Sequence, residues 1–337
     1  MESASPVPAG VLPEAWRIAE EVLFPAAMAT DAADMVPVSH FDALAAAGLY
    51  GIFGPVQAGG LGLDLPGGCA VVEVLAGGCL ATTFVWIQHF GLLRALGADD
   101  APARLRDTWL GPACRGELRA GIALAGLLPG PPRLRARAVS DGWILTGTCP
   151  WVTGWGQINV LLVAARGPDD TIVTLVLDAA DQAGLTITRQ HLTAVNASAT
   201  VQLDFADVLV PAGRLVSLAP FDPAMNLTAA ALRVNGSLAL GLTGRCCRLM
   251  GASPLDDGLD ACRQRLAATG DETIQAARAA ASELAVRAAA ALAVYEGSRS
   301  ITAGAHAQRL AREATFLLVF GSRPGIRADL LRRLGAG

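Results

Sequence analysis

The middle of the chain is set by the stretch Asp141-Gly-Trp-Ile-Leu-Thr-Gly-Thr-Cys-Pro-Trp-Val-Thr-Gly-Trp155. Its opening Asp-Gly pair is typical of a turn, and the β-favouring residues 143–146 that follow predict a short strand ending at Gly147. Trp151 and Thr153 are two positions apart, so their side chains would lie on one face of an extended segment. That face can stack on a flat heteroaromatic ring and hydrogen-bond to its edge. The alternative is a half-buried strand aromatic beside a threonine that favours strands.

Outward from this stretch, the spacing of apolar residues divides the chain into three parts. Short apolar or alternating runs separated by turns predict strands at 121–125, 134–138, 143–146, 159–165, 171–177, 185–188 and 199–205. Helical spacing predicts two helices within 12–50, the first ended by Pro25 and the second by Gly48, two within 66–110, and others at 224–250, 257–268, 272–294 and 304–334. We therefore expect an α+β fold, mostly α, with an N-terminal helical domain (1–119), a middle antiparallel β domain (120–218) and a C-terminal helical bundle (219–337).

The composition excludes some classes of function. The 337 residues carry a net charge of −4, so nothing favours binding to nucleic acid or to an anionic membrane. Hydrophobic residues make up 53% of the chain and charged residues 17%, which indicates large buried faces or subunit interfaces and predicts an oligomer. Residues 74–93 contain no charged side chain and are long enough to cross a bilayer. Their glycines and threonines, with Gln88 and His89, favour buried helices, so we expect no membrane span.

The cysteines point to a reducing compartment. There are seven of them, at positions 69, 79, 114, 149, 246, 247 and 262, and none has the paired spacing of metal ligands, so no metal site is predicted. An odd number, with no basic-then-apolar leader at the N-terminus, indicates reduced thiols that lie mostly in the core. The sequence therefore predicts a cytoplasmic protein.

Three segments resemble the acyl-CoA dehydrogenase family. The first is the Trp-Val-Thr stretch quoted above. The second is the Gly- and Pro-rich run 49–63, and the third is 192–211, which contains Phe-Ala-Asp-Val-Leu-Val-Pro. The resemblance extends over essentially the whole chain and implies the family's order of helical, β and helical domains. For the run 49–63 a phosphate-binding loop is the alternative, but no Gly-Lys-Ser/Thr accompanies it.

The resemblance also implies a cofactor and a substrate class. It implies FAD as the cofactor and an acyl-CoA or acyl-carrier thioester as the substrate. It puts Trp151, Val152, Thr153 and Gly154 against the flavin ring, with the Thr hydroxyl bonded to the ring's edge. It puts His89 in a region that lines the acyl pocket, although a lone histidine among apolar neighbours is more often a satisfied core residue.

A catalytic base is harder to find. In the family a Glu in an Arg-Asp-Ala…Tyr-Glu-Gly-Thr stretch removes the substrate's α-proton while the flavin accepts hydride. Residues 312–322, Arg-Glu-Ala-Thr-Phe-Leu-Leu-Val-Phe-Gly-Ser, fit this stretch without gaps and put Gly321 at the base position. The family's second base position falls near Ala231, with no acid close by. Tyr295-Glu-Gly-Ser298 spells the catalytic motif, so Glu296 is an alternative base; otherwise it is a solvent-facing helix end.

Several FAD contacts of the family are also missing. Residues 125–132, Ala-Gly-Leu-Leu-Pro-Gly-Pro-Pro, replace the flavin loop Thr-Glu-Pro-Gly-x-Gly-Ser-Asp. The Arg-x-x-Phe-Gly element that reaches FAD across the dimer is absent after Gly251, and the loop for the adenine half remains only as Glu-Gly-Ser-Arg at 296–299. The flavin-ring face is thus retained, while the cross-subunit contacts are reduced.

This combination is similar to the short, base-lacking subunits of heteromeric acyl-CoA dehydrogenases from actinobacteria. That resemblance implies a homo- or hetero-oligomer in which a paralogue supplies the base and FAD lies at the interface with it. Two alternatives remain open: a homomeric flavin-dependent tailoring enzyme of secondary metabolism, and a structural subunit without flavin.

Overall fold

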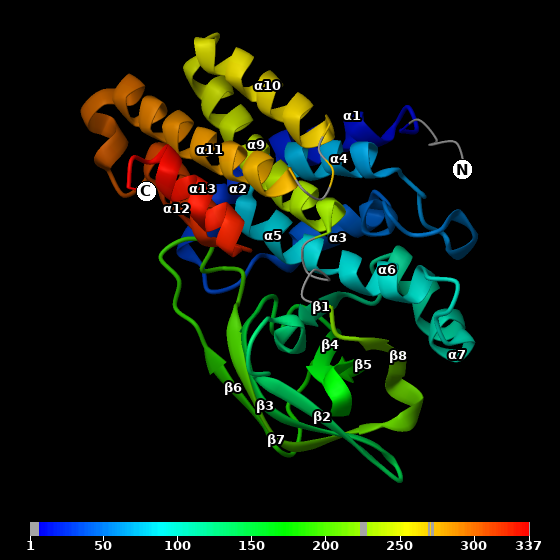
Figure 1. The fold of residues 1–337 in the computed structure, drawn as a ribbon. Helices are drawn as coiled ribbons and strands as arrows, with labels where there is room; N and C mark the ends of the chain where they lie inside the picture. The colour runs from blue at the N-terminus through cyan, green and yellow to red at the C-terminus, as the bar shows by residue number, and fades with distance from the viewer. Residues whose placement is uncertain (1–6, 223–227, 269, 271–272, 337) are drawn as a thin grey trace.

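The computed structural model describes residues 7–222, 228–268, 270 and 273–336. Helices from both ends of the chain lie together on one side of the molecule, and the strands of the middle part form a sheet on the other side (Figure 1). The fold is therefore mostly helical around a central β segment, in the order helical, β, helical that the sequence predicts.

The N-terminal part is helical throughout. Its elements are α1 (Val11–Arg17), η1 (Ile18–Leu23), α2 (Phe24–Ala32), α3 (Val38–Ala46), η2 (Leu49–Gly51), η3 (Val56–Ala58), α4 (Leu65–Gly78), α5 (Leu80–Gln88), α6 (Phe90–Gly97), α7 (Ala103–Leu105), η4 (Arg106–Leu110) and α8 (Gly111–Cys114). Gly48 follows α3 with a φ of 70°, so that helix ends as expected. Residues 65–97 form three consecutive helices rather than two, since breaks occur at Cys79 and His89.

The expectation that Pro25 ends the first helix is wrong. The backbone winds from Val11 to Ala32 without leaving helical angles, and Pro25 lies in the first turn of α2. Proline lacks an N–H and crowds the preceding turn, which usually breaks a helix. Here the turn before it, η1, is a wider π-helical turn, and such turns adjust the backbone where regular bonding fails.

The middle part forms one eight-stranded sheet. Its strands are β1 (Ala120–Ala123), β2 (Leu134–Val139), β3 (Gly142–Val152), β4 (Val160–Arg166), β5 (Thr171–Asp178), β6 (Leu185–Arg189), β7 (Val201–Pro211) and β8 (Leu215–Pro220), in the order β6-β7-β3-β2-β4-β5-β8 with β1 beside β4. Most neighbours are antiparallel, as expected, but β1 and β2 each pair with β4 in parallel. The last strand, β8, lies beyond the predicted strands and pairs with β5.

Strand β3 differs from its sequence prediction in a way that shapes the cavity described below. Gly147 does not end it. The strand continues to Val152, and the register against β7 shifts between Leu145 and Gly147, so the glycine, with a φ of 124°, sits in a bulge. A second shift falls between Cys149 and Val152. Bulges bend a strand and re-aim its side chains, and this one lies next to the cavity.

The C-terminal part is again helical, with α9 (Ala229–Met250), α10 (Pro254–Ala268), α11 (Ile274–Glu296), η9 (Gly297–Ile301), α12 (His306–Val319) and α13 (Pro324–Arg333). The predicted helix 304–334 is divided in two, because α12 ends at Val319 and Pro324 starts α13. The turn between them, residues 320–323, is exposed to the cavity.

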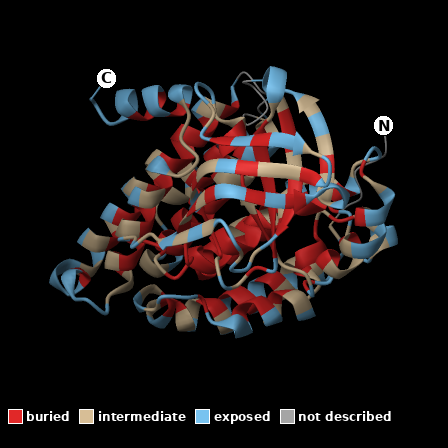
Figure 2. Ribbon diagram, turned by 90° about the horizontal axis from the view of Figure 1, so that it is seen from below, coloured by how far each residue is buried: buried red, intermediate tan, exposed pale blue. Residues whose placement is uncertain are grey.

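Helices from the two ends of the chain share one hydrophobic core. Helices α4 and α9 approach closely because both carry glycine at the crossing: a Cβ on Gly241 would lie 2.2 Å from the Glu73 carbonyl oxygen, and one on Gly77 would lie 3.0 Å from the Gly241 carbonyl oxygen. Figure 2 shows the buried residues gathered between the helices and the sheet, with exposed residues on the outer faces. Residues 74–93 lie across α4, α5 and α6 within this interior, which confirms the expected buried helices. No described helix is both long and apolar enough to span a membrane.

Candidate functional site

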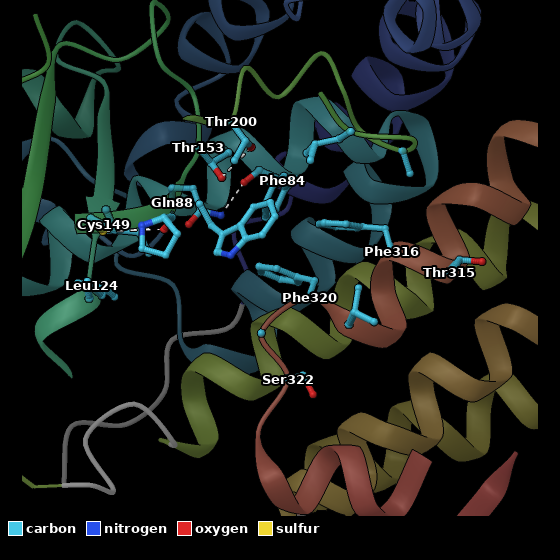
Figure 3. Close-up of a pocket in the computed structure, with 18 of the residues that line it drawn as sticks. Phe84, Gln88, Leu124, Cys149, Thr153, Thr200, Thr315, Phe316, Phe320 and Ser322 are labelled. Atoms are coloured by element: carbon cyan, nitrogen blue, oxygen red, sulfur yellow. Dashed lines mark hydrogen bonds between the residues drawn. The ribbon is translucent and has the colours of Figure 1, made fainter. Parts of the chain in front are cut away.

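A cavity of about 730 Å³ lies where the sheet meets the helices. One wall comes from β3, the turn after β1 and the segment that precedes β7. The other comes from the C-terminal half of α12 and the turn after it, while α5 closes the space between the two walls. Figure 3 shows this arrangement, with Cys149, Thr153 and Thr200 on the sheet side, Phe316, Phe320 and Ser322 on the helical side, and Phe84 and Gln88 between them.

Trp151 and Thr153 both line this cavity, although not for the reason that the sequence suggests. Trp151 is not extended: its φ of 63° places it in the left-handed region, within the bulge that ends β3. Few bulky residues adopt this conformation, which costs on the order of 1–3 kcal/mol. Trp151 is 63% exposed, whereas Thr153 is 3% exposed. The bulge, rather than strand alternation, brings the two side chains to one cavity.

Val152 and Gly154, which are also predicted to lie against the flavin ring, do not line the cavity. Val152 is fully buried in the interior of the sheet and does not line the cavity. Gly154 also lies outside the lining. Its φ is 90°, and a Cβ there would lie 3.0 Å from Val85, so the position suits only glycine. Contact of Val152 and Gly154 with a flavin stays a prediction.

Three buried hydroxyls form a chain that ends at the cavity. The Thr153 and Thr200 hydroxyl oxygens lie 3.3 Å apart, and the Thr200 and Ser198 hydroxyl oxygens lie 2.8 Å apart. The backbone fixes this arrangement, because the Gly154 N–H donates to the Ser198 carbonyl at 2.8 Å. Sequence analysis missed Thr200, although it lies within the segment 192–211 that carries a family resemblance.

Aromatic rings cover much of the opposite wall. Phe84 from α5 makes edge contacts with Phe316 and Phe320, at centroid distances of 5.1 and 4.8 Å, and the latter two rings stack at 5.4 Å. Gln88 is held by a bond from its amide nitrogen to the Phe84 carbonyl at 2.8 Å. This apolar wall offers a surface for an apolar or flat ligand.

No carboxylate lines the cavity among the described residues. Gly321 does line it, in the turn after α12, with a φ of 59°. Ala231 is exposed near the start of α9, and Glu296, the last residue of α11, is half-buried; neither is part of the lining. Glu296 is followed by Gly297 with a φ of 65°, as at an ordinary helix end.

Two arginines line the cavity. Arg312 forms an ion pair with Asp31 at 2.5 Å, and its guanidinium also donates to the Thr193 carbonyl at 2.8 Å. Arg323 stands at the start of α13 and donates only to the neighbouring Ser322 carbonyl, at 3.1 Å, among the interactions of the described residues. The sequence gives one signal for Arg323, its place directly after the segment that aligns with the catalytic stretch.

Buried polar contacts hold the end of α12 in position. Arg278 of α11 donates to the Leu317 carbonyl at 3.2 Å, and the Ser282 hydroxyl donates to the same oxygen at 2.9 Å. One turn further back, the Arg309–Glu313 pair is almost fully buried, with both carboxylate oxygens 2.8 Å from the guanidinium. These contacts fix the helix from which Phe316, Phe320 and Gly321 reach the cavity.

His89 lies outside the cavity. Its Nδ1 accepts from the Ala120 N–H at 3.1 Å, and its Nε2 lies 3.1 Å from the Ala113 carbonyl, so the Nε2–H tautomer satisfies both ring nitrogens. Burial lowers the pKa of this ring to about 4. His89 is therefore a satisfied core histidine that joins α8 to β1.

The cavity fits the ring of a flavin better than its phosphates. An exposed indole and a buried hydroxyl pair face the same space, which suits stacking on a flat ring and bonding to its edge. The loop 125–132, however, carries no hydroxyl or charged side chain, and Pro131 and Pro132 lack N–H donors. No cluster of metal-ligating side chains occurs in the part of the chain that the structure describes, and all seven cysteines are free and buried.

The chain is similar to known proteins over different parts of its length. Residues 11–117 match the family model described as "Acyl-CoA dehydrogenase, N-terminal domain". The chain is 29% identical to benzylmalonyl-CoA dehydrogenase of Aromatoleum aromaticum, over 67% of this chain and 62% of that protein. It is 28% identical to 3-sulfinopropanoyl-CoA desulfinase of Paraburkholderia xenovorans, over 58% and 52%. It thus spans about half to three-fifths of the length of these relatives.

The fold has solved counterparts as well. Butyryl-CoA dehydrogenase from Megasphaera elsdenii superposes with a TM-score of 0.83 at 17% identity, covering 100% of this chain and 99% of that one. At this identity the likeness concerns the fold alone. It agrees with the observed order of N-terminal helices, central sheet and C-terminal helices.

Proposed function

Because the chain belongs to the acyl-CoA dehydrogenase family, we propose that it is a flavoprotein acting on acyl thioesters as a subunit without a catalytic Glu of its own. The observation that carries the proposal is the make-up of the cavity. It combines Trp151 and Thr153 on the sheet side with Gly321, rather than an acid, on the helical side, and none of its described lining residues is Asp or Glu.

The proposed role of the sheet wall is to hold a flavin ring. Trp151 would stack on the ring, and the Thr153 hydroxyl, held by Thr200, would bond to its edge. FAD, when bound, would supply the acceptor for a hydride from the substrate. The aromatic wall of Phe84, Phe316 and Phe320 would exclude water from the acyl group and orient it across the cavity.

A partner chain is the proposed source of the missing base. Val319 lines the cavity and is nevertheless 68% exposed, so the cavity reaches the molecular surface at the end of α12. Other large apolar side chains of the C-terminal part are exposed where its helices end: Val294 and Tyr295 at the end of α11, Ile301 in η9 and Leu334 after α13. Exposed apolar side chains are common at subunit interfaces, which supports an oligomer with a second copy or a base-bearing paralogue.

The buried free thiols support a cytoplasmic location.

The experiment assays the purified chain with a panel of acyl-CoAs and an artificial electron acceptor, alone and with a base-bearing paralogue. A positioned base is worth roughly 10²–10⁴-fold in rate. The turnover rate of the chain alone should therefore be lower by that factor than the rate of the chain assayed with its partner. Gly321→Glu should raise the rate of the lone chain, while the matched Gly321→Gln, which has the same shape but no base, should not. In both variants the side chain at position 321 must adopt a left-handed backbone conformation, which costs about 1–2 kcal/mol.

Glu296→Gln separates this proposal from its rival. The substitution should leave all rates unchanged, because Glu296 does not line the cavity. Rapid turnover of the lone chain that this change abolishes would identify Glu296 as the base and overturn the proposal. A colourless protein that takes up no flavin even in the assembled complex would favour a structural subunit instead.

A further inference from the structure

The two cavity arginines differ in how their charge is neutralised. Arg312 is held by Asp31, with both guanidinium nitrogens bonded to the two carboxylate oxygens, so it carries no free charge into the cavity. Arg323 forms no ion pair with any acid in the described part of the chain. Among the described residues its guanidinium makes one hydrogen bond, which uses one of its five N–H donors. A planar fork of donors is therefore left for a ligand.

The surroundings of Arg323 make it costly to leave its guanidinium without an anionic partner. Partial burial lowers the pKa of the guanidinium, and no nearby carboxylate offsets the effect. Arg323 also precedes Pro324 at the start of α13, a ten-residue helix, so the partial positive charge of the helix N-terminus adds to its own. A partly desolvated cation at such a point is stabilised most by an oxyanion that accepts two hydrogen bonds.

The position of Arg323 indicates which part of a ligand meets it. Arg323 lines the cavity directly after Phe320, Gly321 and Ser322 in the chain. Figure 3 shows Phe320 and Ser322 on the helical side, across from Thr153 and Thr200. If a flavin ring covers the sheet side, as proposed above, the space next to Arg323 is left to the acyl group. From this geometry we infer that Arg323 binds a carboxylate or similar oxyanion on the acyl group, so that the cavity selects acidic acyl thioesters over neutral ones.

The inference rests on the proposed function, and one other oxyanion could reach the same guanidinium. Phosphates of the CoA or FAD moiety carry the same chemistry, but they are present with every acyl group and so give no preference for an acidic one. A preference that depends on Arg323 and on the acyl terminus distinguishes the two sources.

The test is isothermal titration of the purified flavin-containing protein with two matched pairs of thioesters: glutaryl-CoA against pentanoyl-CoA, and succinyl-CoA against butyryl-CoA, with CoA alone as a third arm. Charge-assisted hydrogen bonds are worth about ten- to a hundredfold in affinity, so at least one acidic member should bind that much tighter than its neutral partner. Arg323→Gln should remove the preference and leave the neutral thioester unaffected. Arg323→Lys should keep part of it, since it retains the charge without the fork.

Arg327→Gln is the matched control, because Arg327 is an exposed arginine of the same helix that does not line the cavity. It should leave the preference intact, and thermal melts should place all variants within a few degrees of the parent protein. Equal affinity for the members of both pairs would overturn the inference while leaving the proposed function standing. Loss of affinity for CoA alone in Arg323→Gln would assign the arginine to a phosphate and overturn it too. Failure of every thioester to bind would overturn the proposed function together with the inference.

Discussion

The hydroxyl oxygen of Thr153 lies 3.3 Å from that of Thr200, at the inner end of the sheet wall of the cavity. Both side chains are buried, at 3% and 2% exposure, and Thr200 is bonded in turn to Ser198. Each hydroxyl has one proton and two acceptor positions, so this pairing limits the direction in which Thr153 can present its remaining hydrogen-bonding capacity. Thr200 is thus a positioning residue for Thr153.

The first prediction concerns this pair. Thr200→Val removes the hydroxyl with little change of shape, and leaves Thr153 without a buried partner at a cost of about 1–3 kcal/mol. We expect weaker flavin binding and a shifted flavin absorbance maximum, measured by titrating apoprotein with FAD. The control Thr186→Val changes an exposed threonine of β6 and should alter neither quantity. An unchanged spectrum and affinity in Thr200→Val would show that Thr153 acts without it.

The second prediction separates stability from flavin binding at Trp151. Its left-handed backbone costs on the order of 1–3 kcal/mol, and the residue is 63% exposed, so little burial is lost on replacement. Trp151→Gly should therefore melt at or above the temperature of the parent chain, yet purify with much less flavin. Trp151→Phe should retain most of the flavin. Full flavin content in the glycine variant would refute stacking on the indole.

The third prediction concerns the buried Arg309–Glu313 pair. Removing one member leaves an unpaired charge in the interior, so Glu313→Ala should lower the free energy of unfolding by about 3–5 kcal/mol. The double change Arg309→Met with Glu313→Leu should cost much less, because no uncompensated charge remains. Urea unfolding measures both. Equal losses in the single and double variants would mean that the pair matters for packing rather than for its charges.

The fourth prediction is a loss of stability in mild acid. His89 has a pKa of about 4 in the folded chain, below the ordinary value of 6.5, because burial disfavours the protonated ring. Between these values the unfolded chain binds a proton that the folded chain does not, so stability is complete above about pH 6.5 and falls as the pH is lowered toward 4. The slope from one such histidine is about 1.4 kcal/mol per pH unit.

Urea unfolding at pH 7, 6 and 5 checks this dependence. His306 contributes in the same sense, since burial and the nearby Arg309 and Arg245 lower the pKa of its ring to about 4 as well. The variant His89→Gln, which can still donate to and accept from the backbone, should show a shallower decline than the parent chain. An identical decline in both proteins would exclude His89 as a source of it.

Sequence alone determined the fold class and the order of its parts. Apolar residues at helical spacing before 120 and after 218, and strand-like runs between them, are local signals that burial enforces in any compact arrangement. The ungapped segment 312–322 likewise put Gly321 at the position where an acid was expected, and the structure places that glycine in the cavity lining. Spacing along the chain was sufficient for the fold class, and the family resemblance of segment 312–322 was sufficient for the place of Gly321.

Only the tertiary structure decided how the site is built. Alternation along a strand predicted a shared face for Trp151 and Thr153, but a bulge and a left-handed residue bring them to the same cavity. Neither the contact of Thr153 with Thr200, 47 positions apart, nor the pairing of Arg312 with Asp31, 281 positions apart, has a local signal. Whether Arg312 or Arg323 keeps an unpaired charge depends on the residues that folding brings near it. The periodicity of the sequence does not indicate which residues those are.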